Sequence, residues 1–150
     1  TPVESSPSAT PPSRAITPPP AVARTLPTDV LALSRSFAER FGSFSNQSNF
    51  ENLDELRSLM TPTMQTWADR FIVTERAKRT SNAPYYGVTT RAVETNADGF
   101  DEARGEGVVR VRTQRSEVTG KEMPRLFAQD LSLTWKKIDG EWKVERGEWK

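Results

Sequence analysis

The side chains best suited to catalysis are scarce in this sequence. Its 150 residues include no histidine and no cysteine. It therefore has no Ser-His-Asp or Cys-His nucleophile pair, no imidazole or thiolate ligand for a metal, and no disulfide. We predict no catalytic residue, no metal site and no cofactor. The remaining candidates for chemistry are tyrosines, carboxylates, arginines and aromatic clusters.

Tyr85 and Tyr86 are the first candidates. In an enzyme pocket one of their phenols would act as an oxyanion donor. The interpretation we favour is that the segment Pro84-Tyr85-Tyr86-Gly87 closes the edge of the core, with the hydroxyl groups reaching water.

A set of large aromatic residues is the second candidate: Phe37, Trp67, Phe71 and Trp135. They would line a cavity for a small apolar ligand, but such a set more often forms the core itself. We therefore expect core packing. On that interpretation, Trp67→Ala would cost about 3–5 kcal/mol of stability.

Arg110 and Arg112, with Arg115 and Arg125 close by, would make a basic patch for phosphate. Acidic residues on or beside the same strand favour a mixed, solvated sheet face instead: Glu102, Glu106 and Glu117. The net charge of the chain is +1, whereas a nucleic-acid-binding domain normally has a strong basic excess. Nucleic acid is therefore not an expected partner.

Trp142 and Trp149 are candidates for an interaction surface, together with Arg110 and Arg112. If the last strand is regular, the two tryptophans point to opposite faces of the sheet. One of them must then lie off the core face, and an exposed tryptophan indicates a contact with a partner.

The elements that position these side chains are predicted from periodicity. Apolar residues at three- and four-residue spacing indicate three helices, at about residues 28–42, 52–60 and 61–81, with Thr28 and Thr61 as N-caps. Alternation then indicates four strands, at about residues 85–95, 102–115, 125–138 and 141–149. Their turns are Asp98-Gly99, Thr119-Gly120 and Asp139-Gly140.

The third strand predicts which face of the sheet is apolar. Phe127, Leu131, Leu133 and Trp135 share one parity, with Gln129 as the exception. The last turn is expected to place Trp135 opposite Val144, and Leu133 opposite Arg146. The fold class is therefore α+β, with three N-terminal helices packed on a curved, four-stranded antiparallel sheet.

Residues 1–27 differ from the rest of the chain. They hold eight of the 11 prolines, at positions 2, 7, 11, 12, 18, 19, 20 and 27. We expect this segment to be a disordered, extended Pro-rich linker, and residues 28–150 to form one domain. Because the chain starts at Thr1 without methionine, we also expect that an export signal or membrane anchor precedes it; the alternative is an unrelated N-terminal domain. Apart from such an anchor, we expect no contact with a membrane.

The segments FAERFGSFSNQSNF (37–50), LMTP (59–62), MQTW (64–67) and LSLTWKKIDGEWKVER (131–146) resemble the nuclear-transport-factor-2-like superfamily, the cone-shaped fold of ketosteroid isomerases and SnoaL-like proteins. The likeness covers residues 28–150 and extends to small bacterial proteins anchored outside the membrane. The chain also resembles the periplasmic assembly subunits of type IV secretion systems, which place this fold after a membrane helix and a linker.

The resemblance draws attention to Asp130, because enzymes of this fold hold an acid inside the cone as general base. The parity of Asp130 is that of Ser132 and Thr134, so it is expected to face solvent or a partner. We therefore expect a non-enzymatic, extracytoplasmic interaction or assembly domain that binds a protein partner or itself. The alternatives are a carrier or sensor for a small apolar ligand, and a His-free isomerase or dehydratase.

Overall fold

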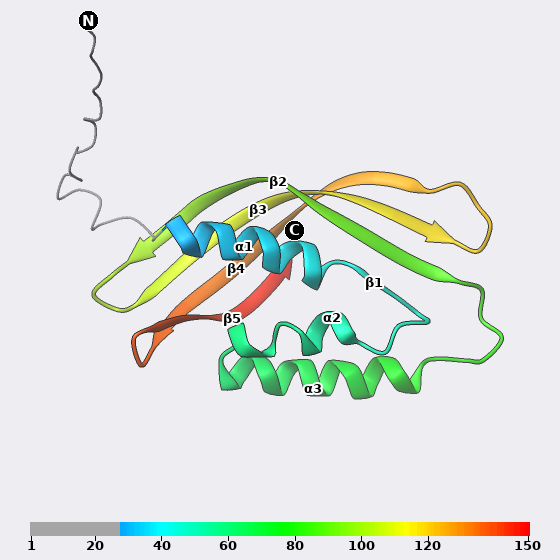
Figure 1. Cartoon of the computed structure of the whole chain (residues 1–150), viewed down its shortest axis with the longest axis horizontal. Helices are drawn as coiled ribbons and strands as arrows, with labels where there is room; N and C mark the ends of the chain where they lie inside the picture. The colour runs from blue at the N-terminus through cyan, green and yellow to red at the C-terminus, as the bar shows by residue number, and fades with distance from the viewer. Residues whose placement is uncertain (1–27) are drawn as a thin grey trace, which may run out of the picture.

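The computed structural model describes residues 28–150, and the expected linker lies outside this range. Three helices and a short 3-10 turn come first: α1 (Thr28–Phe41), α2 (Glu51–Asp54), η4 (Arg57–Leu59) and α3 (Pro62–Ala77). The sheet follows: β2 (Tyr86–Asp101), β3 (Glu106–Thr119), β4 (Arg125–Ile138) and β5 (Glu141–Trp149). Long curved strands and the helices on one side of them give an α+β fold, as expected (Figure 1).

The sheet has five strands rather than the four expected, in the order β1-β2-β3-β4-β5, and every pairing is antiparallel. The additional strand β1 (Phe44–Ser45) pairs with Gly87 and Val88. A strand of two residues is too short for an alternating pattern to be visible in the sequence.

The helix boundaries follow local signals. Thr61 caps α3, because its side chain accepts a hydrogen bond from Met64 N at 3.2 Å, and Pro62 occupies the first turn. The second predicted helix is shorter than expected: it divides into α2 and η4. Among the described helices, none is long and apolar enough to cross a membrane.

The first hairpin turn lies later than predicted. Asp98 and Gly99 are inside β2, where a register shift makes Asp98 an unpaired bulge residue. The chain instead turns at Glu102–Gly105, where Gly105 has a φ of +64°. An Asp-Gly pair suits both a tight turn and a bulge, and the sequence could not separate the two. The turn at Asp139-Gly140 is confirmed, with φ values of 52° and 83°.

A bulge in β5 corrects the predicted register. Trp135 does pair with Val144, but Leu133 pairs with Gly147 rather than Arg146, because Glu145 is inserted between the two pairings. Beyond the bulge, side-chain parity is reversed. Trp149 therefore lies on the same face as Trp142, and the expectation that one of the two must leave the core face was wrong.

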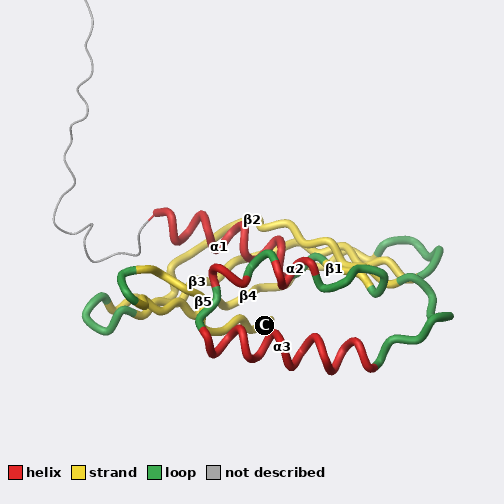
Figure 2. The backbone as a smooth tube through the Cα atoms, turned by 60° about the horizontal axis from the view of Figure 1, so that its bottom comes forward, coloured by secondary structure: helices red, strands yellow, loops and turns green. Residues whose placement is uncertain are grey.

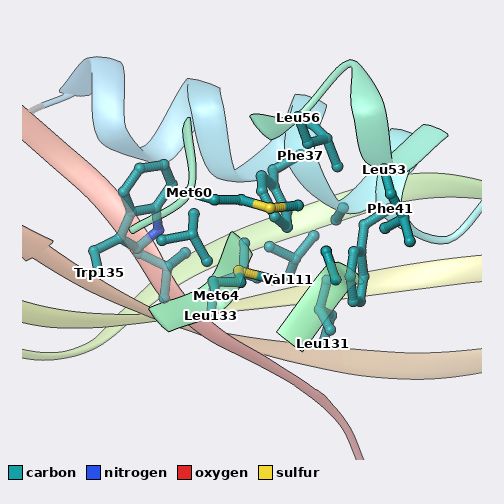
Figure 3. Close-up of a cluster of buried hydrophobic side chains, with 14 of the residues drawn as sticks. Phe37, Phe41, Leu53, Leu56, Met60, Met64, Val111, Leu131, Leu133 and Trp135 are labelled. Carbon is teal, nitrogen blue, oxygen red and sulfur yellow. The ribbon is translucent and has the colours of Figure 1, made fainter. Parts of the chain in front are cut away.

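The core lies between α1, the α2–α3 region and the concave face of the sheet. Trp135, Phe37, Leu131 and Leu133 are fully buried there, and Figure 3 shows this cluster extending from Trp135 to Phe41. The indole Nε1 of Trp135 donates to Ser34 Oγ at 2.9 Å. α3 lies along the β5 side of the sheet (Figures 1 and 2). Only its inner residues Met64, Ala68 and Ile72 are buried.

Candidate ligand-binding cleft

A cleft of about 520 Å³ lies where α3, β1 and the ends of β3 and β5 meet. Its lining combines polar residues with large aromatic side chains, and the aromatic ones come from parts of the chain far apart in sequence: Phe41, Phe44, Phe50, Trp67, Phe71 and Trp149. The volume is in the range of small-molecule sites, roughly 300–1,000 Å³.

The aromatic rings of the cleft form a continuous series. Phe41 lies 5.9 Å from Trp67 and 6.2 Å from Trp149, and Trp67 stacks on Phe71 at 5.2 Å, measured between ring centroids. Trp67 and Phe71 keep 40% and 38% of their surface exposed. The expectation that they belong to the core was therefore wrong: they face an open cleft, while Phe37 and Trp135 are core residues.

Arg115 is the buried charge of this cleft. It is 8% exposed and belongs to the lining. Its guanidinium donates from Nε to Thr90 Oγ1 (3.0 Å), from Nη1 to Gln129 Oε1 (2.8 Å) and from Nη2 to the carbonyl of Gly42 (3.2 Å). The ring of Trp149 covers the guanidinium carbon at 3.9 Å. Burial lowers the pKa of Arg115, opposed by the nearby charges of Tyr86 and Glu117.

The strands place Arg115 inward by simple alternation. Val109, Val111, Thr113 and Arg115 alternate with exposed residues along β3 and are all buried. On the neighbouring strand Gln129 faces the same way, because Thr113 and Gln129 are register partners. Gln129 was the one polar residue in the predicted apolar row of this strand. It has a structural role there, because it accepts a hydrogen bond from the buried guanidinium of Arg115.

Gly42 allows this arrangement to close. A Cβ at this position would lie 2.5 Å from Thr90 Oγ1 and 2.9 Å from Trp149 Cη2. Glycine is required here because the end of α1 approaches the sheet so closely that no side chain fits.

Tyr86, Glu117 and Arg125 form a second polar group at this end of the sheet. The Tyr86 hydroxyl donates to Glu117 Oε2 at 2.5 Å, and Arg125 Nε donates to Glu117 Oε1 at 2.9 Å. These two hydrogen bonds lower the pKa of Glu117. Desolvation, together with the bond to Glu117, raises the pKa of Tyr86. Tyr86 lines the cleft, whereas Tyr85 packs its ring over Gly87 and is 40% exposed.

The other candidate residues lie elsewhere. Arg110 and Arg112 are exposed on the outer face of the sheet, so they do not form one patch with Arg115 and Arg125. Asp130 lies on the outer face too, where its carboxylate is 3.5 Å from Arg112 Nη1. Trp142 is half-buried against Phe100, 6.0 Å away between ring centroids. Within residues 28–150, no cluster of acidic side chains has the form of a metal site.

Comparison with solved structures finds CagV, a VirB8 homologue of the T4SS from Helicobacter pylori strain 26695. The two chains match with a TM-score of 0.57 at 11% sequence identity, over 81% of this chain and 95% of CagV. At this identity the match shows a shared fold. It supports, at the level of the fold, the resemblance to type IV secretion assembly subunits. No protein-family model matches the chain, and no curated protein sequence matches it significantly.

Proposed function

We propose that this chain is a non-enzymatic interaction domain of an extracytoplasmic assembly, held on an N-terminal linker. The observation that carries the proposal is the fold shared with CagV over 95% of that chain. CagV is a VirB8 homologue of a secretion system. The fold alone also serves enzymes, so the chemistry of the described residues must support the choice.

The pKa values of Tyr86, which lines the cleft, and of its neighbour Glu117 are shifted in the directions that oppose acid–base catalysis. A general base at neutral pH needs a raised carboxyl pKa, but the pKa of Glu117 is lowered by Tyr86 and Arg125. The phenol of Tyr86 has a raised pKa, and its proton is already donated to Glu117. Asp130, the acid that the resemblance singled out, pairs with Arg112 on the opposite face of the sheet.

The outer face of the sheet is the surface proposed for partners or for a second copy. It carries both charge signs, as the pair Arg112–Asp130 illustrates, together with Arg110 and Thr134. A surface of mixed charge has no large apolar centre and is suited to weak, specific contacts. A linker that holds several copies close together would strengthen such contacts through effective concentration.

Site-specific photo-crosslinking tests this assignment. A photoreactive amino acid is placed at Arg110 or Thr134 in the full chain, expressed in the cells that produce it. The matched control position is Val73, which is 68% exposed on α3. We expect discrete adducts, with a partner protein or a second copy, from the two sheet positions only. Adducts from Val73 alone, or from no position, would contradict the proposal.

The extracytoplasmic location has its own test. Because the chain contains no cysteine, Met123→Cys supplies a single thiol at a residue that is 89% exposed. A maleimide that cannot cross the inner membrane should label this variant in cells with a permeabilised outer envelope. Labelling that appears only after lysis would place the domain in the cytoplasm and contradict the proposal.

A further inference from the structure

Arg115 is a buried cation whose compensation is incomplete. Its three hydrogen-bond acceptors are the neutral oxygens of Thr90, Gln129 and Gly42. Among residues 28–150 no carboxylate lies within ion-pair distance of it. The nearby carboxylate of Glu117 is held by Tyr86 and Arg125. A guanidinium has five N–H donors, so one donor on each terminal nitrogen is left without an acceptor in the described residues.

The cleft has two other cations. Lys78 Nζ is paired with Glu75 Oε2 at 3.0 Å. Arg79 donates to the carbonyls of Ser48 (2.6 Å) and Ser45 (3.3 Å) and lies over the ring of Phe50 at 4.3 Å, so it too lacks a carboxylate partner among the described residues. Arg115 is the more deeply buried arginine and lies at the end of the aromatic series, because Trp149 covers it and stacks on Phe41.

We propose that the cleft binds a small amphipathic carboxylate: a molecule with one carboxylate group and one apolar chain or ring system. The carboxylate accepts hydrogen bonds from the two remaining donors of Arg115, which match its two oxygens. The apolar part lies along Phe41, Trp67 and Phe71. A volume of about 520 Å³ with one buried arginine at the end of the aromatic series favours a small molecule over a longer acidic peptide. This site goes beyond the assembly function proposed above and does not depend on it.

Three amphiphiles of equal chain length test the site on the unaltered 150-residue chain. Decanoate, decanol and decyltrimethylammonium are titrated below their aggregation limits, with tryptophan fluorescence and calorimetry as readouts, because Trp67 and Trp149 line the cleft. We expect decanoate to bind about tenfold to a hundredfold more tightly than decanol, as one charge-assisted contact allows. The cation should bind most weakly. Equal affinities, a preference for the cation, or no binding of decanoate would overturn the proposal.

Variants locate the preference within the cleft. Arg115→Gln should reduce decanoate binding to the level of decanol, whereas Arg110→Gln, the same change on the outer face of the sheet, should leave the preference intact. Phe71→Ser should weaken decanoate and decanol by the same factor. A preference that survives Arg115→Gln would overturn the proposal. If Arg115→Gln does not fold, the affinities of the three amphiphiles for the wild type and for Phe71→Ser still test the proposal.

A peptide arm separates a small ligand from a segment of a protein. A short apolar peptide is compared with its C-terminally amidated form. Binding of the free-carboxylate peptide without binding of decanoate would overturn the small-molecule assignment in favour of a partner's C-terminus. The outer-face crosslinks proposed above are independent of this cleft, so either proposal can fail alone.

Discussion

At the residue scale, Arg115 joins three parts of the molecule that are distant in sequence. It connects the end of α1 through Gly42, the strand β2 through Thr90 and the strand β4 through Gln129. A buried charge of this kind costs stability unless its hydrogen bonds are made. The same side chain therefore has two roles: it holds the end of the sheet to α1, and it gives the aromatic cleft its charge.

The structural role predicts a loss of stability on substitution. Arg115→Met removes the donor to Gln129 Oε1 and to Thr90 Oγ1, while the Gly42 carbonyl keeps its bond from the Thr90 hydroxyl. The free energy of unfolding should therefore fall by about 1–3 kcal/mol. Urea unfolding measures it. The matched control is Arg112→Met, three residues away on the outer face, which should change stability by less than about 0.5 kcal/mol. Equal losses in the two variants would contradict the account.

The Tyr86–Glu117–Arg125 group predicts how stability depends on pH. Because the pKa of Glu117 is lowered in the folded state, its contribution is complete above the ordinary carboxyl pKa of about 4.3 and is lost as the pH falls through the lowered value. Tyr86 has a raised pKa, so its contribution is present below about pH 10 and is lost as the pH rises further.

Urea unfolding of the wild type and Glu117→Gln across this range provides the test. The variant should be less stable at neutral pH, and the difference should disappear toward strongly acidic pH. A difference that stays constant from neutral to acidic pH would mean that the carboxylate charge of Glu117 does not matter for stability.

Residue types alone indicated part of this site. The tyrosine pair and the aromatic set were found from the sequence, and Tyr86, Trp67 and Phe71 do line the cleft. Arg115 was expected, with Arg110 and Arg112, on a mixed, solvated sheet face, which was wrong because Arg115 is buried. Whether Arg115 is buried depends on which face of β3 its side chain points to, and the two faces of this strand were not assigned from the sequence. Gln129, a polar residue in an apolar row, was the visible signal that a buried partner was needed.

At the element scale, α3 and β5 determine whether the molecule has a cleft at all. α3 buries Met64, Ala68 and Ile72 but leaves Trp67 and Phe71 facing the open space. The bulge at Glu145 turns Trp149 onto the same face as Trp142, where it covers Arg115. Helical periodicity predicted α3 correctly but could not say that only part of its apolar face is covered, because that depends on the distance between helix and sheet.

Truncating Trp135 and truncating Trp67 should lower the stability of the domain by different amounts. Trp135 is fully buried and donates to Ser34, so Trp135→Ala should lower the free energy of unfolding by about 3–5 kcal/mol. Trp67 is 40% exposed, so Trp67→Ala should cost only about 1–2 kcal/mol. Urea unfolding compares them, and losses of similar size would show that Trp67 is core after all.

Deleting Glu145 tests the bulge. Removal of one residue would force either a register slip or a reversal of the faces of Gly147 and Trp149, so stability should fall by about 2 kcal/mol or more. Glu145→Ala keeps the residue count and should stay within about 0.5 kcal/mol of the wild type. A deletion variant as stable as Glu145→Ala, by thermal or urea unfolding, would contradict the assigned register.

The strand boundaries show which local sequence signals predict a hairpin turn reliably and which do not. The Asp139-Gly140 turn was predicted correctly because both residues take positive φ, as a two-residue hairpin requires. The same pair of residue types at 98–99 misled the prediction, since the two bulges of β2 depend on its pairing with β3. The position of a bulge depends on how a strand pairs with its neighbour. The alternation of polar and apolar residues along one strand does not contain that information.

At the scale of the whole molecule, a helix-covered sheet with a charged outer face is proposed as a weakly associating module. Its concave side is filled by the core and the cleft, which leaves the outer face for contacts with other chains. Composition predicts that a Pro-rich linker precedes a near-neutral domain, and of the two the structure describes only residues 28–150. The fold class followed from the switch between the two periodicities, and the match to CagV supports it.

The most direct test of the interaction function is self-association as a function of local concentration. Sedimentation of the full chain at micromolar concentration should give a monomer or a weak dimer, because the outer face lacks an apolar centre. The same chain, attached to vesicles through its N-terminus at high surface density, should show energy transfer between copies labelled at Met123→Cys, and Arg112→Glu should reduce it. A tight dimer in solution, or no energy transfer at any surface density and no crosslinked partner, would contradict the account.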